Sequence, residues 1–152
     1  MVIQQIQQAI LQSSRESKIY IGSDSIAISK RKVGGLFRIA TVVVLHIDGS
    51  KDCQVFSVKV DKKGTDHDLS KPFNRMLAET YKTLAMFESI KDCIGDREVQ
   101  IHLDVNPNES HGSHVATQAA AGLVLGVTQI KPKIKPDAFA ASCAADRFVR
   151  SA

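Results

Sequence analysis

Four acidic residues stand where carboxylates could hold metal ions, namely Asp24, Glu79, Asp104 and Asp146. A carboxylate cluster can bind two Mg²⁺ or Mn²⁺ ions about 3.5–4 Å apart, one activating the attacking water and the other stabilising the leaving oxygen of a phosphodiester. Asp and Glu are the expected ligands because hard divalent cations prefer oxygen. Since such a cluster repels itself without a cation, we expect a protein to keep it mainly for cation binding.

Two of these acids lie in segments that are predicted to be strands. Asp24 stands between two serines and before an apolar run, and Asp104 stands near the end of a later strand. Ligands often bind at the carboxyl ends of strands in α/β sheets, which favours a functional site. The alternative is a solvated aspartate at a strand end, bulge or loop entry, and the sequence leaves it open.

The other two acids lie in predicted helices. Glu79 borders the apolar stripe of a long helix, and Glu88 is its rival on the opposite flank. Asp146 shares a helical face with small and apolar residues, where an acid must be paired, capped or metal-bound. Arg147 and Arg150 are its alternative partners.

Three polar residues next to these acids are accessory candidates: His102 and Asn106 share the strand face of Asp104, and Ser25 follows Asp24. His102 could assist proton transfer or orient a ligand, although a hydrogen-bonded structural histidine fits the sequence equally well.

Basic residues near two predicted strands are candidate phosphate contacts. They are Lys30, Arg31 and Lys32 in the first turn, with Lys131, Lys133 and Lys135 near the fifth strand. Charged hairpin tips are also common without any ligand, so this interpretation stays open.

The elements that must position these residues follow from hydrophobic periodicity. Strands are predicted over 18–30, 37–47, 53–60, 98–105 and 127–134, and helices over 3–11, 70–95, 110–126 and 137–150. Ser70 is the expected N-cap of the long helix, with Pro72 in its first turn and Gly95 at its end. After the N-terminal helix the order is therefore β-β-β-α-β-α-β-α, with an antiparallel meander first.

Length and composition limit the class of protein. A chain of 152 residues that is 43% hydrophobic and 24% charged predicts one globular domain over 1–152, with an N-terminal helix in 1–16 and the core in 18–150. No apolar stretch reaches the roughly 20 residues that span a bilayer, so no membrane segment is expected. The glutamine-rich N-terminal segment predicts that there is no secretory leader. Three widely separated cysteines without a CxxC pair favour a cytoplasmic protein.

The charge balance permits nucleic-acid binding without requiring it. There are 20 basic and 16 acidic residues, a net charge of +4 and a pI near 9.0. Aromatic residues are 5% of the chain and tryptophan is absent, which disfavours base stacking as the main binding mode. The sequence has no GxxxxGK or GxSxG motif, which argues against a P-loop NTPase and a serine hydrolase. Oligomeric state is not predictable here.

Three motifs carry a family resemblance: IYIGSDS at 19–25, IHLDVN at 101–106, and IKPDAFAAS with AADR over 134–147. With these motifs the chain resembles the ribonuclease H-like YkuK family, bacterial and phage proteins predicted to be nucleases, over roughly residues 18–150. The resemblance implies a ribonuclease H-like α/β fold, with a five-stranded mixed sheet and flanking helices. It places the acids of the superfamily on the first strand, first long helix, fourth strand and last helix, matching the four acids above, although no motif fixes the register of Glu79.

The function that this resemblance implies is cleavage of RNA, DNA or a hybrid by a hydrolase with two Mg²⁺ or Mn²⁺ ions. A non-catalytic ribonuclease H-like module that binds nucleic acid or a protein partner is the main alternative. A phosphoesterase for small molecules is a third hypothesis, and the sequence does not decide among them.

Overall fold

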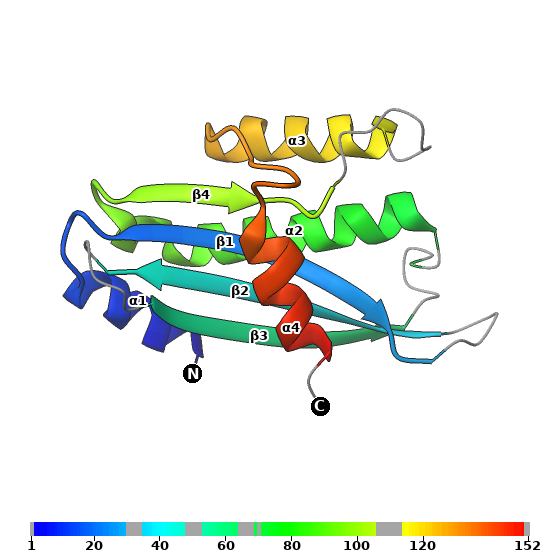
Figure 1. Ribbon diagram of the computed structural model, residues 1–152, viewed down its shortest axis with the longest axis horizontal. Helices are drawn as coiled ribbons and strands as arrows, with labels where there is room; N and C mark the ends of the chain where they lie inside the picture. Colours follow the sequence, from blue (N-terminus) through cyan, green and yellow to red (C-terminus); the bar gives the residue numbers. More distant parts are fainter. Residues whose placement is uncertain are drawn as a thin grey trace.

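A mixed β-sheet forms the centre of the protein, with helices on both of its faces (Figure 1). The computed structural model describes residues 2–29, 35–47, 53–63, 69, 71–105 and 114–150, without the side chains of residues 114, 141–143 and 146. Within these ranges the sheet has four strands in the order β3-β2-β1-β4. They are β1 (Lys18–Ala27), β2 (Leu36–His46), β3 (Cys53–Lys63) and β4 (Glu98–His102). The first three form the predicted antiparallel meander, and β4 is parallel to β1.

The predicted fifth strand over 127–134 is wrong. Its first two residues belong to the helix α3 (His114–Thr128), which the Thr128 hydroxyl closes by bonding the carbonyl of Val124 at 2.7 Å. In the described part of the chain, the rest of the segment makes one isolated parallel bridge, between His102 and Lys133.

Backbone chemistry explains why this segment stops short of a regular strand. Lys133 donates to Ile101 at 2.8 Å and Lys135 donates to Val105 at 3.2 Å, so the segment lies along β4 and its continuation. Pro132 and Pro136 have no N–H, which limits how far a hydrogen-bonded ladder can extend. The segment still fixes Lys135 next to the residues that follow β4.

Two long-range packing clusters bury one face of the sheet. The helices α1 (Val2–Gln12) and α2 (Pro72–Ile94) pack against β1 and β2. The residues of this cluster are Ile6, Ile10, Ile19, Ile21, Val43, Leu45, Met86, Ile90 and Ile94. α3 joins α2 over β4 and its continuation in a second cluster that includes Leu84, Leu103 and Val124. As predicted, Pro72 lies in the first turn of α2 and Gly95 follows its end at φ +58°. The predicted N-cap is wrong: Lys71 occupies that position without a side-chain capping hydrogen bond, and Ser70 lies outside the described residues.

The opposite face is crossed by the last helical segment (Figure 1). It consists of the π-helix η1 (Ala140–Ala145) followed by α4 (Asp146–Arg150), where the periodicity predicts one α-helix over 137–150. Only small residues, AASCAA, make up η1. Ala140 and Ala145 pack there against Val42 of β2. π-helical turns are rare and often occur at functional sites.

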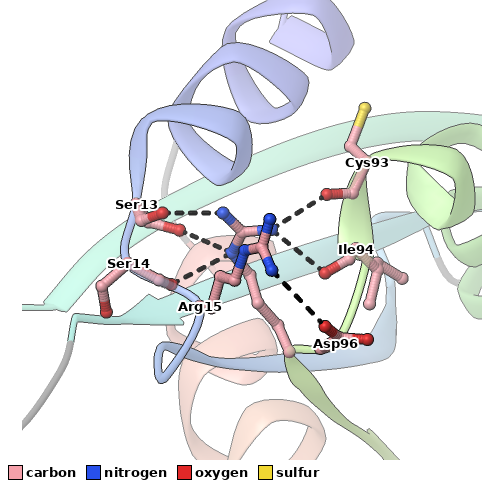
Figure 2. Close-up of polar contacts among 7 residues, drawn as sticks. Ser13, Ser14, Arg15, Cys93, Ile94 and Asp96 are labelled. Atoms are coloured by element: carbon pink, nitrogen blue, oxygen red, sulfur yellow. Dashed lines mark hydrogen bonds and ion pairs between the residues drawn. The ribbon is translucent and has the colours of Figure 1, made fainter.

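An arginine joins the C-terminal ends of α1 and α2 (Figure 2). The guanidinium of Arg97 donates to the Ser13 carbonyl at 2.7 Å, the Ser13 hydroxyl at 3.0 Å and the Ser14 carbonyl at 3.1 Å. It also donates to the carbonyls of Cys93 at 3.3 Å and Ile94 at 3.1 Å. Carbonyl groups at the ends of two helices, which lack helical partners, are thus satisfied by one side chain.

We expect Arg97→Lys to lower the free energy of unfolding by about 2 kcal/mol, because an ammonium cannot reach this set of acceptors. Urea denaturation measures the change. The matched control is Arg15→Lys, since Arg15 lies 3.9 Å from Asp96 with both side chains more than 80% exposed. That exposed pair is worth under about 1 kcal/mol. Equal losses in the two variants would contradict the role assigned to Arg97.

Candidate active site

Two acids follow the point where the β1–β4 ladder ends. The last paired residues are Gly22 and His102, and Asp24 and Asp104 lie two positions further along each strand. Because side chains alternate along strands, Asp24 is expected on the face of Gly22 and Asp104 on the face of His102. Asp24 is 8% exposed, and its Oδ1 accepts the Ser25 N–H at 2.9 Å. Asp24 in β1 and Asp104 just after β4 thus both lie next to the end of the β1–β4 ladder.

Glu79 reaches this end of the ladder from α2. Its Oε1 accepts a hydrogen bond from the Ser25 hydroxyl at 2.5 Å. Next to it, the Ser23 hydroxyl lies 3.0 Å from Thr41 Oγ1 and 2.7 Å from Thr83 Oγ1. A cavity of about 10 Å³ between α2 and the residues after β4 is lined by Glu79, Ser23 and Thr83, among others. These hydroxyls give a buried carboxyl group polar neighbours inside an otherwise apolar layer.

The charges of the three acids act on one another. Burial raises the pKa of Glu79 to about 8, the Ser25 hydrogen bond opposes this, and the negative charges of Asp24 and Asp104 raise it further. The charge of Arg75 lowers it. Asp24 of β1 and Asp104 after β4 thus both act on Glu79 of α2, and we refer to these three acids as the acidic cluster.

A lysine neutralises part of this cluster. Nζ of Lys135 lies 2.8 Å from Oδ1 of Asp104, an atom that is shielded from solvent. The close contact of the ammonium with the Asp104 carboxylate raises the pKa of Lys135; burial opposes this, and the charges of Asp24 and Glu79 raise it further. The ammonium therefore lies in the field of Asp104 and Asp24, and also in that of Glu79 when Glu79 is ionised.

The fourth predicted acid, Asp146, is the first residue of α4. The residue before it, Ala145, is buried against Val42, which pairs with Gly22 across β1 and β2. The backbone of Asp146 therefore crosses the same face of the sheet as Gly22 and, by alternation, Asp24. Its side chain lies outside the described part of the structure, so its participation in the cluster stays a prediction.

The rival helix acid points elsewhere. Glu88 forms an ion pair with Lys91 at 2.8 Å, and both side chains are 47% exposed. The structure thus places Glu79, and not Glu88, beside Asp24 and Asp104.

His102 is fully buried, and both of its ring nitrogens have partners. Nδ1 accepts the N–H of Ala140 at 3.1 Å, and Nε2 lies 3.1 Å from Oε1 of Gln100. The ring packs against Tyr20 and Phe139, with centroids 5.5 and 4.8 Å away. This arrangement favours the structural interpretation, in which His102 fixes the first residue of η1 to β4.

Acid is expected to destabilise the protein through His102. Burial, aided by the charge of Lys133, lowers the pKa of His102 to about 4 from its ordinary value of 6.5. The unfolded chain then binds more protons between these values, so the stabilisation is complete above pH 6.5 and is lost as the pH falls to 4. We expect a loss of about 2 kcal/mol from this residue.

The variant His102→Asn tests whether His102 causes the acid-induced loss of stability. Its amide oxygen can accept the Ala140 N–H, but its side chain does not titrate. Urea denaturation at pH 7 and pH 4.5 should show a smaller acid-induced loss for the variant than for the wild type. Identical losses in both proteins would rule out His102 as the source.

The remaining accessory residues are only partly described. Lys131 and Lys133 are exposed on the segment beside β4, and the charge of Lys133 acts on His102. The other predicted contacts, Asn106 and residues 30–32 in the first turn, lie outside the described residues.

The donor set fits a hard divalent cation by its chemistry, because three mutually repelling carboxylates gain from any cation placed among them. In their present positions, no three Asp, Glu, His or Cys side chains of the described residues are arranged to hold a metal ion. The ion pair of Lys135 with Asp104 supplies positive charge to the cluster instead.

Two features of the site are missed by the sequence patterns. One is the pairing of Lys135 with Asp104, because a fifth strand of unknown register gives Lys135 no defined neighbour. The other is the hydroxyl layer of Ser23, Thr41 and Thr83. A signal for it exists: Ser23 and Ser25 alternate with Asp24, and Glu79 and Thr83 are one helical turn apart.

Comparison with known proteins identifies the family. Among protein-family models, the ribonuclease H-like model matches residues 1–150. Comparison with curated proteins and with solved structures returns no match. Among the described residues, none of the helices has both the length and the hydropathy that are needed to cross a bilayer.

Proposed function

Because the chain belongs to the ribonuclease H-like family, we propose that it is a nuclease that hydrolyses phosphodiester bonds of RNA or DNA with Mg²⁺ or Mn²⁺. The observation that carries this proposal is the contact geometry: Ser25 bonds both Asp24 and Glu79, and Glu79 lines one small cavity together with Asp104. The YkuK-like motifs around Asp24, Asp104 and Asp146 support the same function. They also support Asp146 as the fourth acid.

In this proposal Asp24 and Asp104 would be the main ligands of the ions, and Glu79 and Asp146 would complete the site. Bound Mg²⁺ or Mn²⁺ would activate the attacking water and stabilise charge on the departing oxygen. Ser25 orients Glu79 through its hydroxyl, and the Ser25 N–H fixes one oxygen of Asp24. Glu79 holds a proton at neutral pH in the metal-free protein, because its pKa is about 8. It must lose this proton before it can act as a ligand.

The substrate backbone is expected to approach over the segment beside β4. Lys131 and Lys133 are exposed there, and Lys133 lies close enough to His102 to affect its pKa. Phosphate contacts of this kind position a nucleic acid without reading its sequence. We therefore propose binding that depends strongly on salt and weakly on base identity.

The test is a cleavage panel of labelled RNA, DNA and RNA–DNA hybrid, each with Mg²⁺, Mn²⁺ or a chelator. The proposal expects cleavage of at least one substrate that stops with the chelator. An Asp24→Asn protein purified in parallel controls for contaminating nucleases. Metal-independent cleavage, or cleavage equal in both preparations, would refute it.

A non-catalytic module that binds nucleic acid or a protein partner is the second candidate. The Lys135–Asp104 ion pair favours it, since a lysine can neutralise carboxylates permanently and leave no place for metal. This candidate predicts retention of nucleic acid in a binding assay, with no cleavage in the panel and no stabilisation by divalent ions.

A further inference from the structure

The ammonium group of Lys135 contacts Asp104, one of the acids that the proposed function makes a metal ligand. Its Nζ lies 2.8 Å from Oδ1 of Asp104, and it is attracted by Asp24 as well, and by Glu79 when Glu79 is ionised. One ammonium group therefore lies among acidic residues from β1, α2 and the end of β4, and its direct contact is with Asp104.

We infer that Lys135 is an exchangeable counter-ion, which neutralises the acids of the metal-free protein and which a divalent cation displaces from Asp104. The inference rests on the proposed function, because it concerns the same acids. It adds a competition between a side chain of this protein and its metal.

Electrostatic repulsion prevents the Lys135 ammonium and a divalent ion from contacting Asp104 at the same time. A divalent ion bound to Oδ1 would lie within a few ångströms of the ammonium, and their repulsion is twice that of two unit charges at the same distance. Only one of them can be close to this oxygen. A carboxylate cluster that lacks both would instead carry its own repulsion, so one cation replaces the other.

The local structure allows the ammonium to leave while the backbone stays in place. The Lys135 N–H is bonded to the carbonyl of Val105 at 3.2 Å, which fixes the chain. The side chain of Lys135 is 44% exposed, so its four-carbon stem has solvent to swing into. Among the described residues, Asp104 Oδ1 receives no hydrogen bond of regular geometry, so the contact depends on charge more than on direction.

The first test compares Mn²⁺ affinity in the wild type and in Lys135→Met, which keeps the length of the side chain and removes its charge. Titration calorimetry at constant pH and ionic strength should show about tenfold tighter binding in the variant. The matched control is Lys133→Met, two residues away on the same segment, where the change should stay within about threefold because exposed charges are screened. Unchanged or weaker binding by Lys135→Met overturns the inference.

The second test needs no variant and so does not depend on its folding. Wild-type protein is treated briefly with an amine-acylating reagent at increasing Mg²⁺, and the acylated fraction of Lys135 is read by mass spectrometry relative to Lys133. Displacement predicts a saturable rise of the Lys135 fraction with Mg²⁺, and no rise with NaCl at equal ionic strength. A constant ratio overturns the inference.

These results separate the inference from the proposed nuclease activity. Metal exchange without cleavage of any substrate would refute the nuclease and leave the exchange established. Cleavage by the wild type without tighter Mn²⁺ binding in Lys135→Met would support the nuclease and refute the exchange. If neither the wild type nor the variant binds Mn²⁺, the exchange is refuted directly.

Discussion

Asp24→Asn is expected to reduce divalent-dependent cleavage about 10³-fold or more. Asp24 is buried within β1 and lies in the cluster that includes Glu79. An amide is isosteric but carries no charge, so a charged ligand would be lost and with it several kcal/mol of transition-state stabilisation. Single-turnover cleavage of the best substrate, measured at saturating Mn²⁺, gives the ratio of rates.

The control for this variant is Glu88→Gln, the same loss of charge on an acid that pairs with Lys91 at the surface of α2. Its cleavage rate should stay within about twofold of the wild type, since surface ion pairs contribute little. In chelator, Asp24→Asn should melt at or above the wild-type temperature, because it removes repulsion from the cluster. Undiminished cleavage by Asp24→Asn, or equal losses in both variants, would end the proposal that Asp24 is a ligand.

The sequence predicts the sheet well where periodicity and turn residues agree. β2 has a continuous run of Val, Ile and Thr, which fits its burial on both faces between α2 and η1. The long helix α2 carries a proline in its first turn and a glycine after its end, as predicted, although its N-cap is Lys71 and not Ser70. Local rules of this kind need no knowledge of distant partners.

The predictions from the sequence fail where the backbone departs from the expected strand or α-helical period. Val127 and Thr128 have high strand propensity, yet they complete the helix α3, where the Thr128 hydroxyl bonds the Val124 carbonyl within the helix. The small residues of η1 adopt a π-helix, which no 3.6-residue pattern can indicate. Because η1 precedes Asp146, the predicted helical face of that residue depends on a period that the chain does not keep.

The site shows the same division between local and long-range information. The positions of Asp24 and Asp104 follow from strand ends, and Glu79 is distinguished from Glu88 only by which flank of α2 faces the sheet. The ion pair of Lys135 with Asp104 joins residues 31 positions apart through a segment without regular structure. Its register cannot be predicted from alternation, so the counter-ion becomes visible only in three dimensions.

Raising the pH should destabilise the metal-free protein through Glu79. The folded state holds the Glu79 proton up to a pKa of about 8, whereas the ordinary value is 4.5. Between these values the folded state binds more protons than the unfolded state, so the free energy of unfolding falls as the pH rises. The stabilising effect of the protonated carboxyl is complete below pH 4.5 and is lost as the pH passes through 8.

Glu79→Gln should therefore be more stable than the wild type at pH 9 in chelator, by about 2–3 kcal/mol, and nearly equal to it at pH 5, because glutamine resembles the protonated acid. Urea denaturation at the two pH values gives this difference, with Glu88→Gln as a control whose curve should follow the wild type. Saturating Mn²⁺ at pH 8 should reverse the order, since only the wild type can offer a Glu79 carboxylate to the ion. Parallel pH dependence of Glu79→Gln and wild type in chelator would show that Glu79 is ionised at neutral pH, and a failure of Mn²⁺ to reverse the order would remove Glu79 from the proposed ligands.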